Sequence, residues 1–416
     1  MNYSLFKKNS LIIIFWLIAL LPISLIFSKF ATNAIVGLVS VIIVIFTLFT
    51  KRIEDFKNKY IYFFLIFWFY ISIRSLFSDY PIFSLKSSLL YIRFIFLIYA
   101  FYYLSLYYEG FLKKLFYIFF ISSIILVVDA YIQFIFGINL IGYDKSILEN
   151  NRISGFFGKE LILGSYVMRV CFIIIALSSL VNIKYKNFLV ILMLFITLHI
   201  CLISGERTSF FLAIIGTISY FIMTYQISLR NKLLIFFSIA ILTLVTLKNF
   251  EGIQKRMVNQ TIHDLSSADN ILMFSKGHSS HFMTALNLYH DNRIFGQGSN
   301  LFRILCDTNE FYINEKGCST HPHNFYYQIL AENGLIGLSF LTIFYSAIMF
   351  MALKHCYYKY FLRKRFLDEY KIGITISLLV SFWPLAPSGN FFNSWLATIY
   401  FIQIALLFIG LKKNEI

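Results

Sequence analysis

The stretch LIIIFWLIALLPISLIFS, residues 11–28, decides the fold class of this chain. It holds no charged residue, and a helix of about this length reaches across the hydrocarbon core of a bilayer. Lys7 and Lys8 precede it, as in a secretory signal peptide, but no small-residue cleavage site follows. Instead a second apolar run, TNAIVGLVSVIIVIFTLF at residues 32–49, comes directly after it. We therefore interpret residues 11–28 as the first of several membrane helices.

The composition extends this interpretation to the whole chain. Of 416 residues, 59% are hydrophobic and 13% are charged, with a mean hydropathy of +0.75, whereas about one quarter of the residues in soluble proteins are charged. The apolar runs are continuous rather than alternating, which excludes a transmembrane β-barrel. We predict an all-α polytopic membrane protein with about twelve spans. The expected spans are residues 11–28, 32–49, 60–77, 89–108, 114–136, 161–181, 187–203, 209–226, 232–248, 323–353, 372–387 and 392–411.

Lysine and arginine residues predict the orientation of these spans. The net charge of +16 would suggest a nucleic-acid partner for a soluble protein, but in a membrane protein it reflects the basic bias of cytoplasmic loops. Basic clusters such as Lys113-Lys114 and Arg363-Lys364-Arg365 fall in short segments that are cytoplasmic if the N-terminus is cytoplasmic. Both termini are then inside, and the long segments 137–160 and 249–322 face outward.

The chain is thereby divided into three parts. Residues 1–248 hold nine spans, residues 249–322 form an extracytoplasmic loop domain between spans nine and ten, and residues 323–416 hold the last three spans. The polar turn Ser204–Ser209 also lies on the outer side. We therefore expect the chemistry of the protein at this surface.

Three arginines, Arg74, Arg93 and Arg169, lie inside the predicted spans, in the outer half of the membrane. A charged side chain there costs at least a few kcal/mol, so it needs a partner or a function. They either pair between helices and reach toward the interface, or they form a cationic pocket at headgroup depth. Such a pocket would suit a lipid-borne diphosphate, because guanidinium groups bind phosphate oxygens in pairs.

Two of the five cysteines, Cys306 and Cys318, lie in the outer loop domain, twelve residues apart. In an oxidising compartment they would form a disulfide that contributes about 3 kcal/mol. A metal site with His321 and His323 is the alternative, but the chain has neither a C-x2-C nor an H-E-x-x-H pattern. We favour the disulfide.

Three motifs, in order along the chain, resemble those of the O-antigen ligase and O-antigen polymerase superfamily. Ser204-Gly205-Glu206-Arg207-Thr208 is similar to the family's Ser-Gly-x-Arg-Thr turn. Gly296-Gln297-Gly298 with Phe302 is similar to its G-x-G-x-x-x-F element, and His323-Asn324 followed by Gly334 and Gly337 is similar to its histidine signature. The twelve-span layout with one large loop agrees with the family as well.

The resemblance implies a glycosyltransferase at the periplasmic face of the bacterial inner membrane. Its donor would be a glycan on undecaprenyl diphosphate, and its acceptor a sugar hydroxyl on lipid A-core or on a growing glycan. Arg207 would hold the diphosphate, and His323 would activate the acceptor hydroxyl. Many relatives carry a second functional arginine where this chain has His278. Arg256 or Arg303 would then supply the missing charge.

Further substrate contacts are expected around the histidine motif and in the spans. Asn324 would bind a sugar hydroxyl or orient the neighbouring histidine, and His321 would shape the loop or bind a headgroup. Arg93 and Arg169 would contact the diphosphate. Glu206 would orient Arg207 or solvate the turn.

The chemistry expected is a single displacement that inverts the anomeric centre. Arginines would neutralise the leaving diphosphate without a metal, and a histidine would accept the acceptor proton. No cofactor is predicted, because the chain lacks a phosphate-binding G-x-x-x-x-G-K-[ST] loop and a D-x-D pair. We favour ligation to lipid A-core over polymerisation of repeat units. A lipid-linked glycan transporter is the alternative from another class, but no internal repeat supports it.

Overall fold

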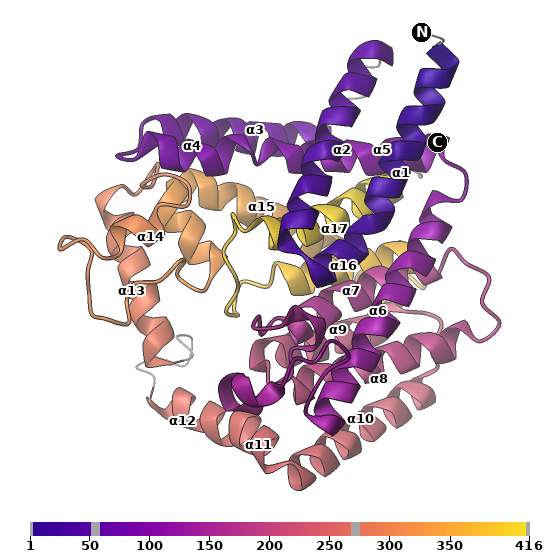
Figure 1. Cartoon of the computed structure of the whole chain (residues 1–416). Coiled ribbons are helices and arrows are strands. Elements are labelled where there is room, and N and C mark those ends of the chain that lie inside the picture. Colours follow the sequence, from indigo (N-terminus) through magenta and orange to yellow (C-terminus); the bar gives the residue numbers. More distant parts are fainter. Residues whose placement is uncertain (1–2, 51–58, 268–274, 413–416) are drawn as a thin grey trace.

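The structure is a computed structural model that describes residues 3–50, 59–267 and 275–412. Helices dominate the described part, in which no strand occurs beyond one isolated bridge between Ile138 and Asp144. Their arrangement is drawn in Figure 1. The helices are α1 (Tyr3–Phe27), α2 (Lys29–Thr50), α3 (Lys59–Leu76), α4 (Pro81–Leu89), α5 (Ile92–Tyr107), α6 (Phe111–Phe136), α7 (Leu163–Ser178), α8 (Lys186–Ile203), α9 (Arg207–Met223), α10 (Leu229–Asn249), α11 (Glu251–Gln254), α12 (Gln260–Ser267), α13 (Lys276–Asp291), α14 (Phe302–Leu305), α15 (Phe325–Tyr360), α16 (Glu369–Ser381) and α17 (Ser394–Lys412).

The all-helical membrane fold predicted from the sequence is confirmed, and each expected span contains a helix. Eight helices of the described part are long and apolar enough to cross a membrane, and α3, α7 and α9 are shorter apolar helices. The number of twelve spans therefore stays a prediction. The basic residues Lys51, Arg52, Lys57 and Lys413, which also enter the predicted orientation, lie outside the described residues.

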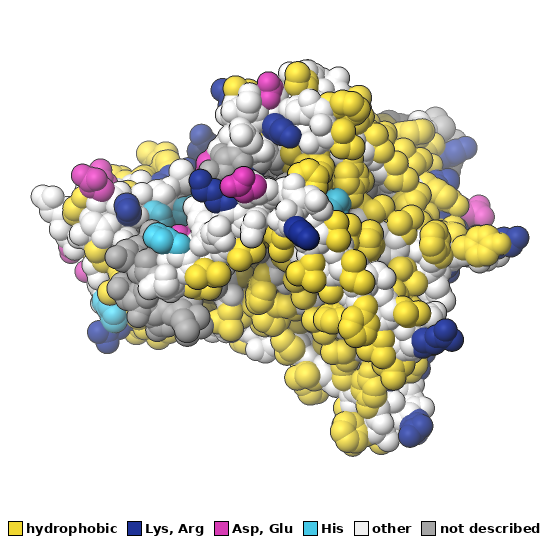
Figure 2. Space-filling model, turned by 90° about the horizontal axis from the view of Figure 1, so that it is seen from below, with side chains coloured by type: hydrophobic (Ala, Val, Ile, Leu, Met, Phe, Trp, Pro, Cys, Tyr) yellow, Lys and Arg dark blue, Asp and Glu magenta, His cyan; other side chains and the backbone are white. Residues whose placement is uncertain are grey.

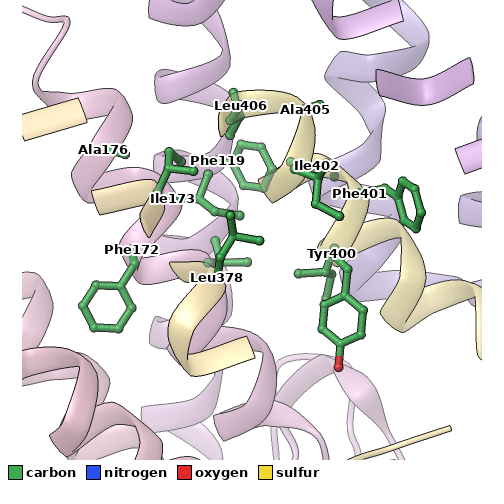
Figure 3. Close-up of a cluster of buried hydrophobic side chains, with 14 of the residues drawn as sticks. Phe119, Phe172, Ile173, Ala176, Leu378, Tyr400, Phe401, Ile402, Ala405 and Leu406 are labelled. Atoms are coloured by element: carbon green, nitrogen blue, oxygen red, sulfur yellow. The ribbon is translucent and has the colours of Figure 1, made fainter. Parts of the chain in front are cut away.

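The centre of the molecule is built from α7, α16 and α17. All of α16 is buried, and α17 is buried from Trp395 to Gly410. Figure 3 shows side chains of these helices and of α6 pointing toward one another, among them Phe119, Leu378 and Ile402. Gly373 lets α16 approach α7 closely, because a Cβ there would lie 2.8 Å from the Cα of Ala176. By contrast, α10 is mostly exposed and apolar, as expected of a helix that faces lipid.

The predicted loop domain at 249–322 is largely helical in its described part. In Figure 1, α11 and α12 continue from α10 along the lower edge of the molecule, and α13 turns back toward α14 and α15. A separate small core, which includes Leu288, Phe302 and Phe311, holds α13 and α14 against the start of α15. Cys306 and Cys318 are joined by a disulfide beside this core, with their Cα atoms 5.0 Å apart.

Glycines of two motifs lock this domain onto α15. The helix is interrupted at Gly334, which has φ 63° and ψ −166°, a conformation that only glycine adopts readily. A Cβ at Gly334 would lie 2.2 Å from the Ile294 carbonyl oxygen, and one at Gly296 would lie 2.4 Å from the Asn333 nitrogen. The two backbones cross in direct contact, and the Gly298 N–H donates to the Glu332 carbonyl at 2.7 Å. The glycines thus fix where the outer domain sits.

Candidate active site

The first half of the site is the turn that begins α9. Gly205 adopts φ 69°, and Arg207 is the first residue of the helix. The Arg207 guanidinium donates to the Asp264 carboxylate at 2.9 Å and to the Thr261 hydroxyl at 3.4 Å, both on α12. The predicted diphosphate residue is therefore at the surface of the outer domain, half-buried and paired with an acid.

Glu206, the residue before Arg207, is directed away from it. Its carboxylate accepts the backbone N–H groups of Gly164 at 2.7 Å and Ser165 at 2.9 Å, and the Ser209 hydroxyl at 3.0 Å. A carboxylate on free N–H groups at a helix start is a stabilising cap. Glu206 therefore ties the turn to the start of α7, instead of orienting Arg207 or solvating the turn.

Two further arginines flank the same turn. Arg256 donates from Nε to the Gly205 carbonyl at 3.5 Å, and from Nη1 to the Gln260 amide oxygen at 2.7 Å. Arg152 donates from Nε to the Ser204 carbonyl at 2.9 Å and is 9% exposed. Burial lowers the pKa of each guanidinium. At Arg152 the charge of Glu206 opposes this shift and the charge of Arg256 adds to it, and at Arg256 the charge of Arg207 adds to it. The sequence interpretation did not single out Arg152, which stands out only as a cation in the polar stretch before Gly155.

The second half of the site is a cluster of four histidines. His278 and His281 come from α13, and His321 and His323 come from the segment before α15. The ring centroid of His323 lies 4.4 Å from that of His321, 4.9 Å from His281 and 5.7 Å from His278. Within the described part of the chain, no three His, Cys, Asp or Glu side chains are placed to hold one metal ion.

The environment keeps the histidines of this cluster neutral. Burial lowers the pKa of His323 to about 3, and the neighbouring His321, His281 and His278 lower it further. Burial also lowers the pKa of His321 to about 4, against a backbone hydrogen bond at Ser388, with added repulsion from Arg303 and His281. Unprotonated imidazoles can accept protons, so the cluster has the protonation state of a base. A pKa this low also makes His323 a weaker proton acceptor than an ordinary histidine.

The backbone around His323 is held firmly. The residue has φ 54°, in the left-handed region, and its carbonyl accepts the Ser388 N–H at 2.7 Å. Asn324 is 3% exposed and caps α15 by accepting the N–H groups of Tyr326 and Tyr327. Its amide nitrogen donates to the carbonyls of Pro384 and Ala386. Asn324 thus fixes the start of the helix behind the histidine.

His278 connects the two halves. Burial lowers its pKa, and the nearby charges of His281 and Arg207 lower it further, while Asp264 opposes them. The same residue therefore lies within electrostatic range of Arg207 and 5.7 Å in ring centroid from His323. The structure brings the predicted base and the predicted diphosphate residue to one region, although they are 116 positions apart in sequence.

The remaining predicted site residues are spread more widely. Arg93 donates to Asn33 on α2 at 3.2 Å and to Ser394 on α17 at 2.9 Å, which fits an interhelical pair. Arg169 is buried one helical turn below Ser165, to whose carbonyl it donates at 2.8 Å, and its guanidinium lies 5.9 Å from the Tyr400 ring centre. Arg303 is exposed on α14, within electrostatic range of His321.

Arg74 also has a structural partner. Its Nε donates to the Gly296 carbonyl at 2.7 Å, and Nη1 donates to the Phe77 carbonyl at 2.6 Å. It thereby joins α3 to the glycine crossing described above. The interhelical alternative that the sequence left open fits Arg93, and Arg74 instead binds backbone carbonyls outside the helices. By contrast, Arg207, Arg152 and Arg256 gather at the turn.

The surface reflects this division. Seen from the side of α11 and α12, histidine, basic and acidic side chains gather on one part of the molecule, and hydrophobic side chains cover the part beside it (Figure 2). An amphipathic ligand with a charged head and a hydrocarbon tail matches such a surface. These features define a multi-pass helical membrane protein with a polar site on one end of its helices.

Comparison with protein families shows what part of the chain is similar to. Residues 190–342 match the family model described as O-antigen ligase, which confirms the resemblance predicted from the three motifs. The matched stretch runs from α8 into α15 and holds Arg207, Arg256 and all four clustered histidines, while Arg152 lies outside it. No curated protein matches the chain. The match supports an activity of the O-antigen ligase or polymerase type in a bacterial membrane.

Proposed function

We propose that this protein is an inverting glycosyltransferase that moves a glycan from undecaprenyl diphosphate to a sugar hydroxyl, with lipid A-core as the acceptor. One observation carries the proposal: His278 brings the Arg207 turn and the His323 cluster into one region. The two groups have the complementary chemistry that such a transfer needs, a cationic site for a leaving diphosphate and a neutral base for a hydroxyl.

The reaction would be a single displacement. His323 accepts the proton of the acceptor hydroxyl as its oxygen attacks the anomeric carbon of the donor sugar. The bond from that carbon to the phosphate oxygen breaks, and the diphosphate leaves with its negative charge. Arg207 and Arg256 stabilise this charge through hydrogen bonds that strengthen as it develops. Arg207 must then share or exchange its present partner, Asp264.

The placement of charge along the helices supports an outward-facing site. The helices α9 and α15 begin at the site, whereas their other ends meet the start of α16. There Lys359 donates to the Thr224 carbonyl at 2.6 Å, and Thr224 donates to the Glu369 carboxylate at 2.9 Å. The run Arg363-Lys364-Arg365 lies at the same end. A basic end opposite the histidines is the pattern of a cytoplasmic surface, so the site would face the periplasm and both termini the cytoplasm.

The decisive experiment is transfer by purified protein from a lipid-linked glycan to an acceptor in excess EDTA. The proposal expects full activity, because arginines serve as the counter-charge to the diphosphate. Activity that EDTA abolishes and Mg²⁺ or Mn²⁺ restores would contradict this mechanism.

Polymerisation of repeat units is the second candidate, because it shares the same donor chemistry and the same family match. The lipopolysaccharide of a deletion strain distinguishes the two. Loss of all long glycan with accumulation of lipid-linked polymer indicates a ligase, whereas survival of core with a single repeat indicates a polymerase.

A further inference from the structure

The buried arginine at the turn, Arg152, has a place in the site that neither its motif context nor the family match assigns. It lies in the segment between α6 and α7, outside the matched residues 190–342. Its Nε is used to hold the Ser204 carbonyl at 2.9 Å. Within the described part of the chain, its terminal guanidinium nitrogens form no hydrogen bond or ion pair. The side chain is 9% exposed and its terminal nitrogens keep some access to the surface, so they are placed to bind a ligand.

The packing at Gly205 shows how close the arginines come. A Cβ on Gly205 would lie 3.2 Å from the Nε of Arg152 and 3.4 Å from the Cγ of Arg256. The two side chains therefore lie against the same glycine and hold successive carbonyls of the turn. Arg207 follows two residues later, so three guanidinium groups surround one short turn.

The acids nearby are largely engaged elsewhere. Glu206 is bonded to the start of α7, and Asp264 is paired with Arg207. Glu149 lies 3.9 Å from Arg256 at an exposed position, where an ion pair contributes little. Glu206 still offsets part of the charge of Arg152, but the three guanidinium groups also repel one another, and a multiply charged anion between them would relieve that repulsion.

A buried network from α6 fixes the position of Arg152. The side-chain oxygen of Gln133 accepts the N–H groups of Ser154 and Gly155, each at 2.8 Å. Asn139 donates to the Gly155 carbonyl at 3.0 Å and to Asp129 at 3.3 Å. Polar groups inside a membrane helix are expensive, and here they anchor the segment that begins at Arg152.

We propose that Arg152 is a third arginine of the anion site: its Nε positions the Ser204–Glu206 turn, and its terminal nitrogens bind a diphosphate together with Arg207 and Arg256. The inference rests on the proposed function for the source of the diphosphate, a lipid-linked glycan donor. Its geometric part, a diphosphate site that depends on Arg152, stands separately.

The test is calorimetric binding of inorganic pyrophosphate to the full-length protein in detergent at fixed ionic strength. Arg152→Gln is expected to weaken binding by about ten- to a hundredfold, the usual effect of losing a hydrogen bond to a charged group. Arg152→Lys keeps the charge but loses the turn contact, so it should retain more affinity and lower turnover. Lys159→Gln is the matched control, because Lys159 is an exposed cation of the same segment.

Three outcomes would overturn the inference. They are wild-type protein that does not bind pyrophosphate, a folded Arg152→Gln variant that binds it normally, and a Lys159→Gln variant that is equally impaired. If Arg152→Gln does not fold, the test uses Arg152→Lys, for which the donor KM and the turnover number are measured separately. The inference expects turnover to fall more than donor affinity. Displacement of pyrophosphate by a prenyl diphosphate supports the lipid-borne source, whereas orthophosphate that binds equally well would refute a diphosphate site.

The same data separate this inference from the proposed function. Pyrophosphate binding that depends on Arg152, without any glycan transfer, leaves the anion site standing and refutes the transferase. If glycan transfer requires Arg207 but proceeds normally in Arg152→Gln, with an unchanged donor KM, the proposed function stands and the role of Arg152 is refuted.

Discussion

At the scale of single residues, the site separates side chains that face the substrate region from those that hold the backbone. His323 presents a neutral imidazole beside three others. Asn324, next to it in sequence, uses its side-chain amide to hydrogen-bond the start of α15 and the segment after α16. Adjacent positions in a motif therefore have different physical roles, because Asn324 is the N-cap of the helix that begins at Phe325, whereas His323 precedes the cap.

Replacing His323 by alanine tests the base. We expect His323→Ala to reduce turnover by about 10² to 10⁴-fold, the usual contribution of acid–base catalysis, with donor binding little changed. The measurement is transfer in vitro with protein shown to be folded. His290→Ala, at the exposed end of α13, should keep wild-type turnover. Near-normal turnover in the His323 variant would remove it from the mechanism.

Replacing Arg207 by lysine tests how the diphosphate is held. Lysine keeps the charge but lacks the planar fork that binds two phosphate oxygens. Arg207→Lys should therefore raise the donor KM and lower turnover, with Arg207→Ala more severely affected. A lysine variant that behaves as wild type beside an inactive alanine variant would show that only charge matters.

The histidine cluster should make the fold sensitive to acid. The pKa of His321 is about 4 in the folded protein and 6.5 without its surroundings, so between these values only the unfolded chain binds the proton. The stability is complete above pH 6.5 and falls toward pH 4, by roughly 1 kcal/mol per pH unit. His321→Gln should flatten the pH dependence of thermal unfolding in this window, and His290→Gln should not. Equal slopes for His321→Gln and wild type would contradict this account.

At the scale of elements, the interrupted helix α15 decides where the histidines lie. Its break at Gly334 receives the segment around Gly296, and that crossing holds the outer domain with α13. The histidine signature and the G-x-G element are thus two sides of one contact. Within the signature, His323 joins the histidine cluster, whereas Asn324 and the glycines hold the backbone.

Gly334→Ala tests this crossing. The new Cβ would overlap the Ile294 carbonyl, and the backbone at φ 63° and ψ −166° would be strained, so we expect a loss of at least about 2 kcal/mol in stability. Thermal unfolding in detergent measures the effect. Gly37→Ala is the matched control, because a Cβ at Gly37 would meet nothing within 4 Å. A variant at Gly334 as stable as the control would show that the crossing can relax.

At the scale of the whole molecule, the two ends of the helical bundle differ in character. Arginine and histidine side chains around the α9 turn mark one end, and the lysines and arginines near the junction of α15 and α16 mark the other. A diphosphate lipid would enter the first end with its head at the turn and its tail along the apolar helices. The orientation of the bundle thus determines which compartment supplies the acceptor.

Cysteine labelling tests this orientation. With Cys356→Ser as the background, Lys159→Cys and Lys364→Cys each place a thiol at an exposed position, one at either end. A membrane-impermeant maleimide added to intact spheroplasts should label the first variant and reach the second only after the membrane is opened. The reverse pattern would place the site in the cytoplasm.

The sequence by itself determined the class of fold and indicated the family resemblance. Long apolar runs must become helices in a membrane, because no water is available there for an unpaired backbone. The three motifs were enough to indicate the family resemblance, since turn glycines and polar side chains are local features. The roles that they suggest for Arg207 and His323 stay predictions. Most expected spans end within three residues of the helices, but α1 begins at Tyr3 rather than 11, α15 ends at Tyr360 rather than 353, and α16 ends at Ser381 rather than 387. The short helices α4 and α11 to α14 and the break in α15 were not expected.

Only the tertiary structure decided which residues meet. The partners of an arginine depend on helix packing, so Arg93 and Arg74 were indistinguishable in sequence from site residues until Ser394 and the Gly296 carbonyl were placed beside them. Arg152 was missed because its neighbours at the Ser204 turn are 52 positions away. The histidine cluster likewise needed α13 to fold back onto α15. This contact depends on the small core between these helices and on the glycine crossing, and both join residues that are far apart in sequence.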